Sequence, residues 1–136
     1  MVDDIDLQLI DILKENSRLS FADLGRKVNL SPSAVRDRVQ KMEEHEIIKK
    51  YSIQLDHKKL GNDIEAFILL KVFPGQLKNV LEKINDFKEI KEAHRITGNQ
   101  NIHLKVVVKN QICLQELLDQ FMVFSDTNTF LILSKV

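Results

Sequence analysis

The sequence has one cysteine, two prolines, four glycines and no tryptophan among its 136 residues. Cys113 has no partner for an internal disulfide, and its apolar neighbours predict a buried rather than a reactive thiol. No apolar run approaches the roughly 20 residues that a membrane-spanning helix needs. The N-terminus carries Asp3, Asp4 and Asp6, whereas a secretory signal is basic and then apolar. We therefore expect a cytoplasmic protein without disulfides.

The chain also lacks an excess of charge of either sign, since twenty Lys and Arg residues balance twenty Asp and Glu residues. This balance conceals a separation along the chain. Residues 1–15 hold five acidic side chains and one basic, whereas residues 24–41 hold five basic side chains and one acidic. The second segment predicts contacts with the phosphates of double-stranded DNA, for which Arg26, Lys27 and Lys41 are candidates. Ordinary surface charge is the alternative interpretation.

Apolar residues make up 43% of the chain and recur with helical spacing over the first 45 residues. Asp3 or Asp4 can cap a first helix, and Ser20 can cap a short second one. Ser31-Pro32 is typical of a helix start, because proline at the first helical position loses no hydrogen bond. We expect this third helix to run to about residue 45. Three helices in this order predict a helix-turn-helix module, winged-helix-like in type.

Beyond residue 47 the apolar pattern changes to that of strands alternating with helices. The predicted order after the connecting segment is βαββαβ, which is the ferredoxin-like arrangement of an α+β domain. We expect a DNA-binding domain at 1–50, a connecting strand and linker at 51–62, and a ferredoxin-like domain at 63–136. The individual elements are expected at 47–55 (strand), 64–73 (strand), about 77–84 (helix), 90–97 (strand), 102–108 (strand), 111–121 (helix) and 129–133 (strand).

The third helix has a polar face opposite its apolar positions Val35, Val39 and Met42. Several side chains on that face have the chemistry to read DNA. Arg36 suits guanine and Gln40 suits adenine, each through two hydrogen bonds. Asp37 can accept from cytosine or hold Arg36 in place. The candidate DNA-binding residues, some of which could equally form a solvated helix face, are Ser31, Ser33, Arg36, Asp37, Gln40, Lys41, Arg26 and Lys27.

An ordered series of residues along essentially the whole chain resembles the Lrp/AsnC family, the leucine-responsive or feast/famine regulators. The series is Asp3-x-x-Asp6-x-x-Leu9-Ile10-x-x-Leu13, Asn16-Ser17-Arg18-Leu19-Ser20, Leu24-Gly25, Val28-x-Leu30-Ser31, Val35-x-x-Arg38-Val39-x-x-Met42-Glu43, Ile47-Ile48-x-x-Tyr51 and Leu60-Gly61. The resemblance implies a transcription regulator that forms dimers and commonly larger rings such as octamers, and that often responds to amino acids.

Two residues depart from the family pattern in the helical module. Glu46 stands where the family usually has glycine just after the third helix, so this helix end needs either a different geometry or a left-handed non-glycine residue. Gly25 stands where alanine is usual. This glycine costs roughly 1 kcal/mol of helix propensity and allows a closer packing of the backbone.

The polar turn between two predicted strands, Thr97-Gly98-Asn99-Gln100-Asn101, corresponds to the family's Thr-Gly-x-x-Asp loop. The resemblance implies that this loop helps to bind an amino-acid effector between subunits. Asn101 replaces the family's acidic residue, so charge pairing with an ammonium group is lost. Thr127 and Thr129 match the threonines that begin the family's last strand. The candidate effector-binding residues are therefore Thr97, Gly98, Asn99, Gln100, Asn101, Thr127 and Thr129.

The sequence offers no support for catalysis, a cofactor or a metal. The four histidines have no partners at ligand spacing, and no nucleophile, phosphate-loop or dinucleotide motif is present. We expect a homo-oligomer, because a sheet with helices on one face leaves apolar residues on the other. Three other hypotheses remain at this point: a ligand-independent architectural DNA-binding protein, an RNA-binding domain, and a small-molecule-binding domain of similar fold.

Overall fold

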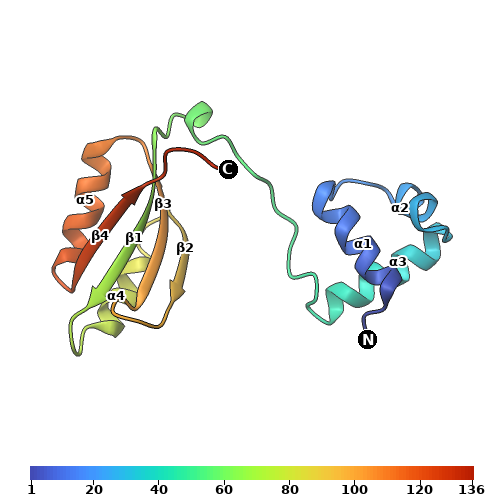
Figure 1. Cartoon of the computed structure of the whole chain (residues 1–136), viewed down its shortest axis with the longest axis horizontal. Helices are drawn as coiled ribbons and strands as arrows, with labels where there is room; N and C mark the ends of the chain where they lie inside the picture. The colour runs from blue at the N-terminus through green and yellow to red at the C-terminus, as the bar shows by residue number, and fades with distance from the viewer. The chain divides into compact units, whose positions relative to one another are not determined.

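The computed structural model describes residues 1–136, and these form two compact units, Met1–Gln54 and Leu55–Val136 (Figure 1). Each unit has its own cluster of buried side chains. No helix is long and apolar enough to cross a membrane. The α+β fold class predicted from the sequence is confirmed.

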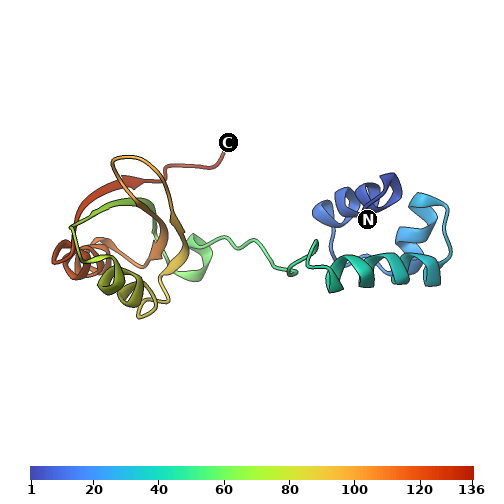
Figure 2. The same cartoon turned by 90° about the horizontal axis from the view of Figure 1, so that it is seen from below.

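The N-terminal unit consists of three helices, α1 (Asp4–Glu15), α2 (Phe21–Val28) and α3 (Pro32–Glu44) (Figure 2). All three predicted N-caps form. Asp3 accepts from the backbone of Asp6 while Asp6 accepts from that of Asp3, and Ser20 and Ser31 accept from the third helical residue after them. The helices enclose a small core in which five apolar side chains are nearly inaccessible: Leu9, Leu24, Val35, Val39 and Met42.

The turn between α2 and α3 depends on Gly25. Asn29 ends α2 in the left-handed conformation, and the backbone N–H of Leu30 donates to the Gly25 carbonyl at 2.9 Å. A Cβ on Gly25 would lie 2.3 Å from the Leu30 carbonyl oxygen, which is far inside contact distance. The expectation that glycine permits a closer approach here is confirmed, and the element that approaches is the following turn.

The end of α3 adopts a left-handed residue that is not glycine. Glu46 has φ 56°, and the backbone N–H groups of Ile47 and Ile48 both donate to the Met42 carbonyl, at 2.8 and 3.0 Å. This is the geometry that usually takes glycine after a helix, because a left-handed residue with a side chain is strained. Of the two possibilities left open by the sequence, the strained one is therefore present.

The predicted connecting strand at 47–55 is wrong. Residues 49–56 are extended but form no backbone hydrogen bond with any other backbone group, and the next element is a short 3₁₀ helix, η1 (Lys58–Leu60). The prediction rested on β-branched residues mixed with lysines, and the apolar side chains of the segment are exposed: Tyr51, Ile53 and Leu55 are 47%, 80% and 51% exposed. A strand also needs a neighbour for its N–H and C=O groups, and this chain supplies none.

The C-terminal unit is a four-stranded antiparallel sheet in the order β2-β3-β1-β4, which confirms the ferredoxin-like prediction. Its elements are β1 (Ile64–Val72), α4 (Leu77–Ile84), β2 (Ile90–Arg95), β3 (Ile102–Val108), α5 (Gln111–Met122) and β4 (Ser125–Leu131). The last strand begins four residues earlier than predicted. Its polar start pairs with β1, since Ser125 lies opposite Val72 in the register.

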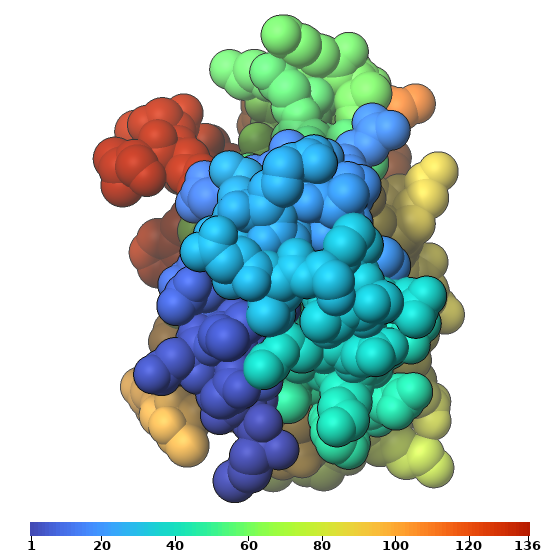
Figure 3. All heavy atoms as spheres, turned by 90° about the vertical axis from the view of Figure 1, so that its right-hand side faces the viewer, coloured from blue at the N-terminus to red at the C-terminus, as the bar shows by residue number.

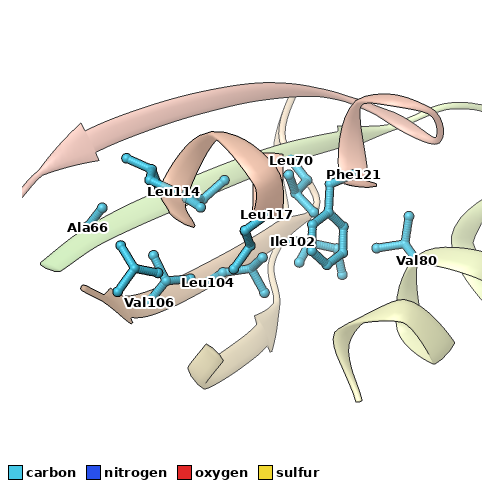
Figure 4. Packing of buried hydrophobic residues seen from close by; sticks show 11 residues of the cluster. Ala66, Leu70, Val80, Ile102, Leu104, Val106, Leu114, Leu117 and Phe121 are labelled. Atoms are coloured by element: carbon cyan, nitrogen blue, oxygen red, sulfur yellow. The ribbon is translucent and has the colours of Figure 1, made fainter. Parts of the chain in front are cut away.

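Both helices cover one face of this sheet, and the strands bury alternate residues against them (Figure 2). Figure 4 shows Phe121 of α5 between the sheet and Val80 of α4, with Leu70 and Ile102 beside it. The opposite face has no helix. We call it the open face, and its residues in the paired strands include Phe67, Leu69, His94, His103, Lys105 and Phe130.

Candidate DNA-binding surface and candidate effector loop

The exposed face of α3 carries the side chains that were predicted from the sequence to contact bases. Val35, Val39 and Met42 are 3% exposed or less, whereas the residues between them reach solvent. Figure 3 shows α2 (light blue) and α3 (cyan) side by side on the surface of the N-terminal unit. The exposed candidates are Ser31, Ser33, Arg36, Asp37, Gln40, Lys41, Arg26 and Lys27.

Ser31 has a structural task at the start of α3. Its hydroxyl accepts from the Ala34 backbone N–H at 3.2 Å and lies 3.2 Å from the Ser33 hydroxyl. With Ser31 committed to the cap, Ser33 is the hydroxyl on this turn that is available for an external hydrogen bond. The backbone N–H of Ser33, which has no partner within the first turn, adds a partial positive charge at the same place.

The basic candidates differ in how firmly acidic neighbours hold them. Arg26 is bound to Asp23 three residues earlier on α2. The Arg36 guanidinium lies 3.7 Å from the Asp37 carboxylate, which is close enough for attraction but too far for a hydrogen bond. Lys27 and Lys41 form no ion pair. Arg36 and the two lysines can therefore reach an external partner without breaking a hydrogen bond.

Arg38 has a different role from the other basic residues of this segment. Its guanidinium binds both carboxylate oxygens of Asp3, at 2.8 and 2.7 Å, and one oxygen of Asp6 at 3.1 Å. These bonds hold the pKa of Asp3 below its usual range and raise the pKa of Arg38. They join α3 to the N-terminus of α1, so one of the five positive charges counted in residues 24–41 serves the fold.

Sequence reasoning missed this ion pair, although all three residues belong to the family pattern. The sequence nevertheless contains a signal for this ion pair. Asp3 is the N-cap of α1 and Asp6 lies in its first turn, and Arg38 lies close in sequence to the buried positions Val35 and Val39. A basic residue at the border of a helical core needs an acidic partner more often than one on an exposed face does.

The effector candidates 97–101 form the loop between β2 and β3, and Asn101 ties this loop to β1. The Asn101 backbone N–H donates to the Leu70 carbonyl at 2.9 Å, and the Val72 backbone N–H donates to the Asn101 side-chain oxygen at 3.0 Å. Gly98 has φ 113°, a conformation that side chains disfavour. Because the amide oxygen of Asn101 already accepts a hydrogen bond, the amide NH₂ is its free group.

Thr127 and Thr129 lie on β4, opposite Leu70 and Ile68 of β1, and both are half-buried on the helix-covered side. Asn101 and Thr127 therefore flank the same end of β1 from two sides, about 10 Å apart across two strand spacings. Thr129 lies about 7 Å further along its strand. The structure brings the loop and Thr127 to one end of the sheet and leaves Thr129 towards its middle.

No cluster of three or more His, Cys, Asp or Glu side chains is arranged to hold a metal ion. Cys113 is half-buried and free.

Each of the two units matches a known protein-family domain. Residues 2–43 match the AsnC-type helix-turn-helix domain, and residues 65–136 match the Lrp/AsnC ligand-binding domain. The chain belongs to the Lrp/AsnC family. The resemblance read from the sequence is thus confirmed, and with it the assignment as a helix-turn-helix transcription regulator.

Relatives named as transcriptional regulators match this chain along nearly its whole length. The regulator LrpB of Bacillus subtilis is 33% identical over 135 residues, covering 99% of this chain and 91% of the relative. LrpC of the same organism is 32% identical over 99% of this chain and 94% of the relative. Both are named HTH-type transcriptional regulators.

Solved Lrp/AsnC structures share the fold. The structure of B. subtilis LrpC covers all of this chain and 97% of its own with a TM-score of 0.94. Escherichia coli AsnC is 27% identical, with a TM-score of 0.86 over 99% of this chain and 94% of its own. A regulator from Neisseria meningitidis in complex with L-Met, at 19% identity, covers all of this chain and 92% of its own with a TM-score of 0.92.

Proposed function

We propose that this Lrp/AsnC regulator reads an operator through the exposed face of α3, as a cytoplasmic homo-oligomer that acts by binding rather than catalysis. Residues 1–50 are the DNA-binding domain, 51–62 the connection, and 63–136 the domain for oligomerisation and effector binding. The observation that carries the proposal is the division of α3 into a buried apolar face and an exposed face whose basic residues lack strong internal partners.

Within this surface the residues have separate tasks. Arg36 and Gln40 read bases in the major groove, and Asp37 orients Arg36 or accepts from cytosine. Ser33 binds a phosphate or base edge at the start of α3. Lys27, Lys41 and Arg26 neutralise phosphates and supply affinity without sequence preference. Ser31 contributes by capping the helix that carries them.

Selection of bound DNA from a random pool tests this division of tasks. Arg36→Ala should relax the base preference at one operator position, by about 1–3 kcal/mol of discrimination. The matched change Lys27→Gln should weaken binding to all sequences about equally and reduce the salt slope by about one. Uniform weakening by Arg36→Ala would make Arg36 a phosphate contact and remove it from base reading.

Oligomerisation through the open face completes the proposal. Phe67 and Phe130 are register partners there and are 36% and 53% exposed, which is a large apolar area for a free surface. A second copy placed against this face buries both rings. Such a dimer offers two α3 helices to half-sites about 34 Å apart, one turn of DNA. Further association of dimers leads to rings such as octamers.

The loop 97–101 and Thr127 are the proposed effector site, with Thr129 as a more distant contributor. The free amide NH₂ of Asn101 is a donor, so it suits the carboxylate of an amino acid better than its ammonium group. A second candidate function has one observation in its favour. Because Asn101 already connects β1 and β3, the loop is held without a ligand, as a ligand-independent architectural DNA-binding protein would require.

A further inference from the structure

Two histidines lie beside the aromatic residues on the open face of the sheet. His94 of β2 and His103 of β3 are register partners, and directly opposite residues project to the same side of a sheet. Their ring centroids are 6.5 Å apart. The His103 ring also packs against Phe67, with the centroids 5.1 Å apart. A second copy that covers Phe67 therefore also covers His103 and meets His94 beside it.

On the β2 side of this histidine pair, the nearest carboxylate already faces a lysine. Glu92 lies two residues before His94 and projects to the same side of β2. Its register partner is Lys105, which lies two residues after His103 on β3. Neither histidine forms an ion pair. A protonated imidazole here would meet one carboxylate and one ammonium group, with no net negative charge to balance it.

On the β1 side, His103 faces apolar and basic residues. Its register partner is Leu69, and the next residue on this side of β1 is Lys71, which lies opposite Asp126 of β4. The other acidic residue on this side of β1 is Glu65, four residues from Leu69 and so about 13 Å along the strand. Protonation of His103 thus adds a charge that no adjacent group on β1 neutralises.

We propose that His94 and His103 make association through the open face sensitive to acid. This inference rests on the proposed dimer and concerns its regulation. Both copies in a two-fold dimer use the same patch, so four imidazoles come together at one interface. Neutral imidazole can be buried there, whereas an imidazolium that loses its water without gaining an opposite charge is disfavoured. The dimer therefore binds fewer protons than two separate chains do.

The direction of the pH effect follows from this difference in bound protons. Imidazole is the side chain that ordinarily changes charge between about pH 5 and 8. Because the separate chains take up more protons, the dissociation constant of the dimer should rise as the pH falls through this range. The two α3 helices are then no longer offered as a pair to two half-sites. The Asp3–Arg38 ion pair responds only below about pH 4, so its effect is separate.

Sedimentation equilibrium of the full chain at about pH 7.5 and about pH 5.5 tests this inference. We expect the dissociation constant to be about tenfold or more higher at the lower pH. The double variant with His94→Gln and His103→Gln carries neutral side chains at both pH values, so its dissociation constant should change little. The matched variant His45→Gln removes an exposed histidine of the N-terminal unit and should keep the pH dependence of the wild type.

Equal dissociation constants at the two pH values would overturn the inference, and so would a double variant as sensitive to acid as the wild type. Loss of the pH dependence with His45→Gln would assign the effect to the N-terminal unit. Failure of the proposed dimer itself looks different. A wild type that is monomeric at the higher pH, or a dimer that survives Phe67→Asp, would overturn the open face as the interface and the inference with it. Circular dichroism at the lower pH verifies that each protein remains folded.

Discussion

Gly25 is the residue on which the turn of the DNA-binding unit most directly depends. We expect Gly25→Ala to destabilise the protein by about 1–2 kcal/mol, because the added Cβ meets the Leu30 carbonyl and outweighs the roughly 1 kcal/mol of helix propensity that alanine brings. Urea unfolding followed by circular dichroism measures the change. Lys27→Ala on the exposed side of α2 is the control and should stay within about 0.5 kcal/mol. A stabilised Gly25→Ala variant would show that the turn moves away at little cost.

Glu46 is strained in the present sequence, so its replacement should improve stability. Glu46→Gly should stabilise the protein by about 1 kcal/mol, because glycine adopts a positive φ without a steric penalty. Glu44→Gly, two residues earlier at the last position of α3, should destabilise by about 0.5 kcal/mol. Thermal unfolding of both variants beside the wild type gives the comparison. Melting temperatures that shift in the same direction would contradict this account of the helix end.

The Asp3–Arg38 ion pair should make the N-terminal unit sensitive to acid. The pKa of Asp3 is lowered in the folded protein, mainly by its hydrogen bond to Arg38, so the ion pair stabilises fully above the ordinary pKa of aspartate. This stabilisation should be lost as the pH falls below about 4 and through the lowered pKa of Asp3. Asp23 has a lowered pKa for a similar reason, its bonds to Ser20 and Arg26.

Asp3→Asn removes the negative charge of residue 3 but keeps its helix cap, because asparagine caps helices as well as aspartate does. The variant should be less stable than the wild type at neutral pH and should lose less of its stability between neutral and acid pH. Unfolding followed by circular dichroism from pH 7 downwards measures both effects. Parallel pH profiles for the two proteins would mean that Asp3 contributes only its cap.

Among the elements, the loop 97–101 is the one whose function a ligand screen can decide. If the loop and Thr127 bind an amino acid, one of the twenty should raise the melting temperature, by an amount that grows with its concentration. Asn101→Ala is unsuitable as a probe, because it also removes the hydrogen bond from Val72. Asn99→Ala is a better variant, since Asn99 is exposed and forms no hydrogen bond, and it should reduce the shift. No shift with any amino acid would support the architectural alternative.

The helices were predictable because each begins with its own local signal. Ser31-Pro32 marks the start of α3, and its apolar spacing identifies the buried face without knowledge of any other element. The strand prediction at 47–55 was wrong because a composition typical of strands is only half of what a strand requires. Asn101 and Arg38 show a related limit, since their partners Val72 and Asp3 lie 29 and 35 residues away in sequence. Contacts over such separations are set by the packing of whole elements.

At the scale of the molecule, the open face should determine whether the chain associates. Phe67→Asp introduces a charge at the centre of this face and should convert a dimer into a monomer in sedimentation equilibrium. Ile112→Asp is the matched control, because Ile112 is 68% exposed on α5 rather than on the sheet, and it should leave the dimer intact. A dimer lost with Ile112→Asp but kept with Phe67→Asp would place the interface elsewhere.

The lack of backbone hydrogen bonds in residues 49–56 makes this segment a site for proteolytic cleavage. Proteases bind their substrates as extended strands, and this segment is already extended, exposed and free of backbone hydrogen bonds. One cut there separates the helix-turn-helix unit from the ligand-binding unit, while each fragment keeps its own complete core. A single cleaved peptide bond can thus divide the chain between its two cores without disturbing either of them.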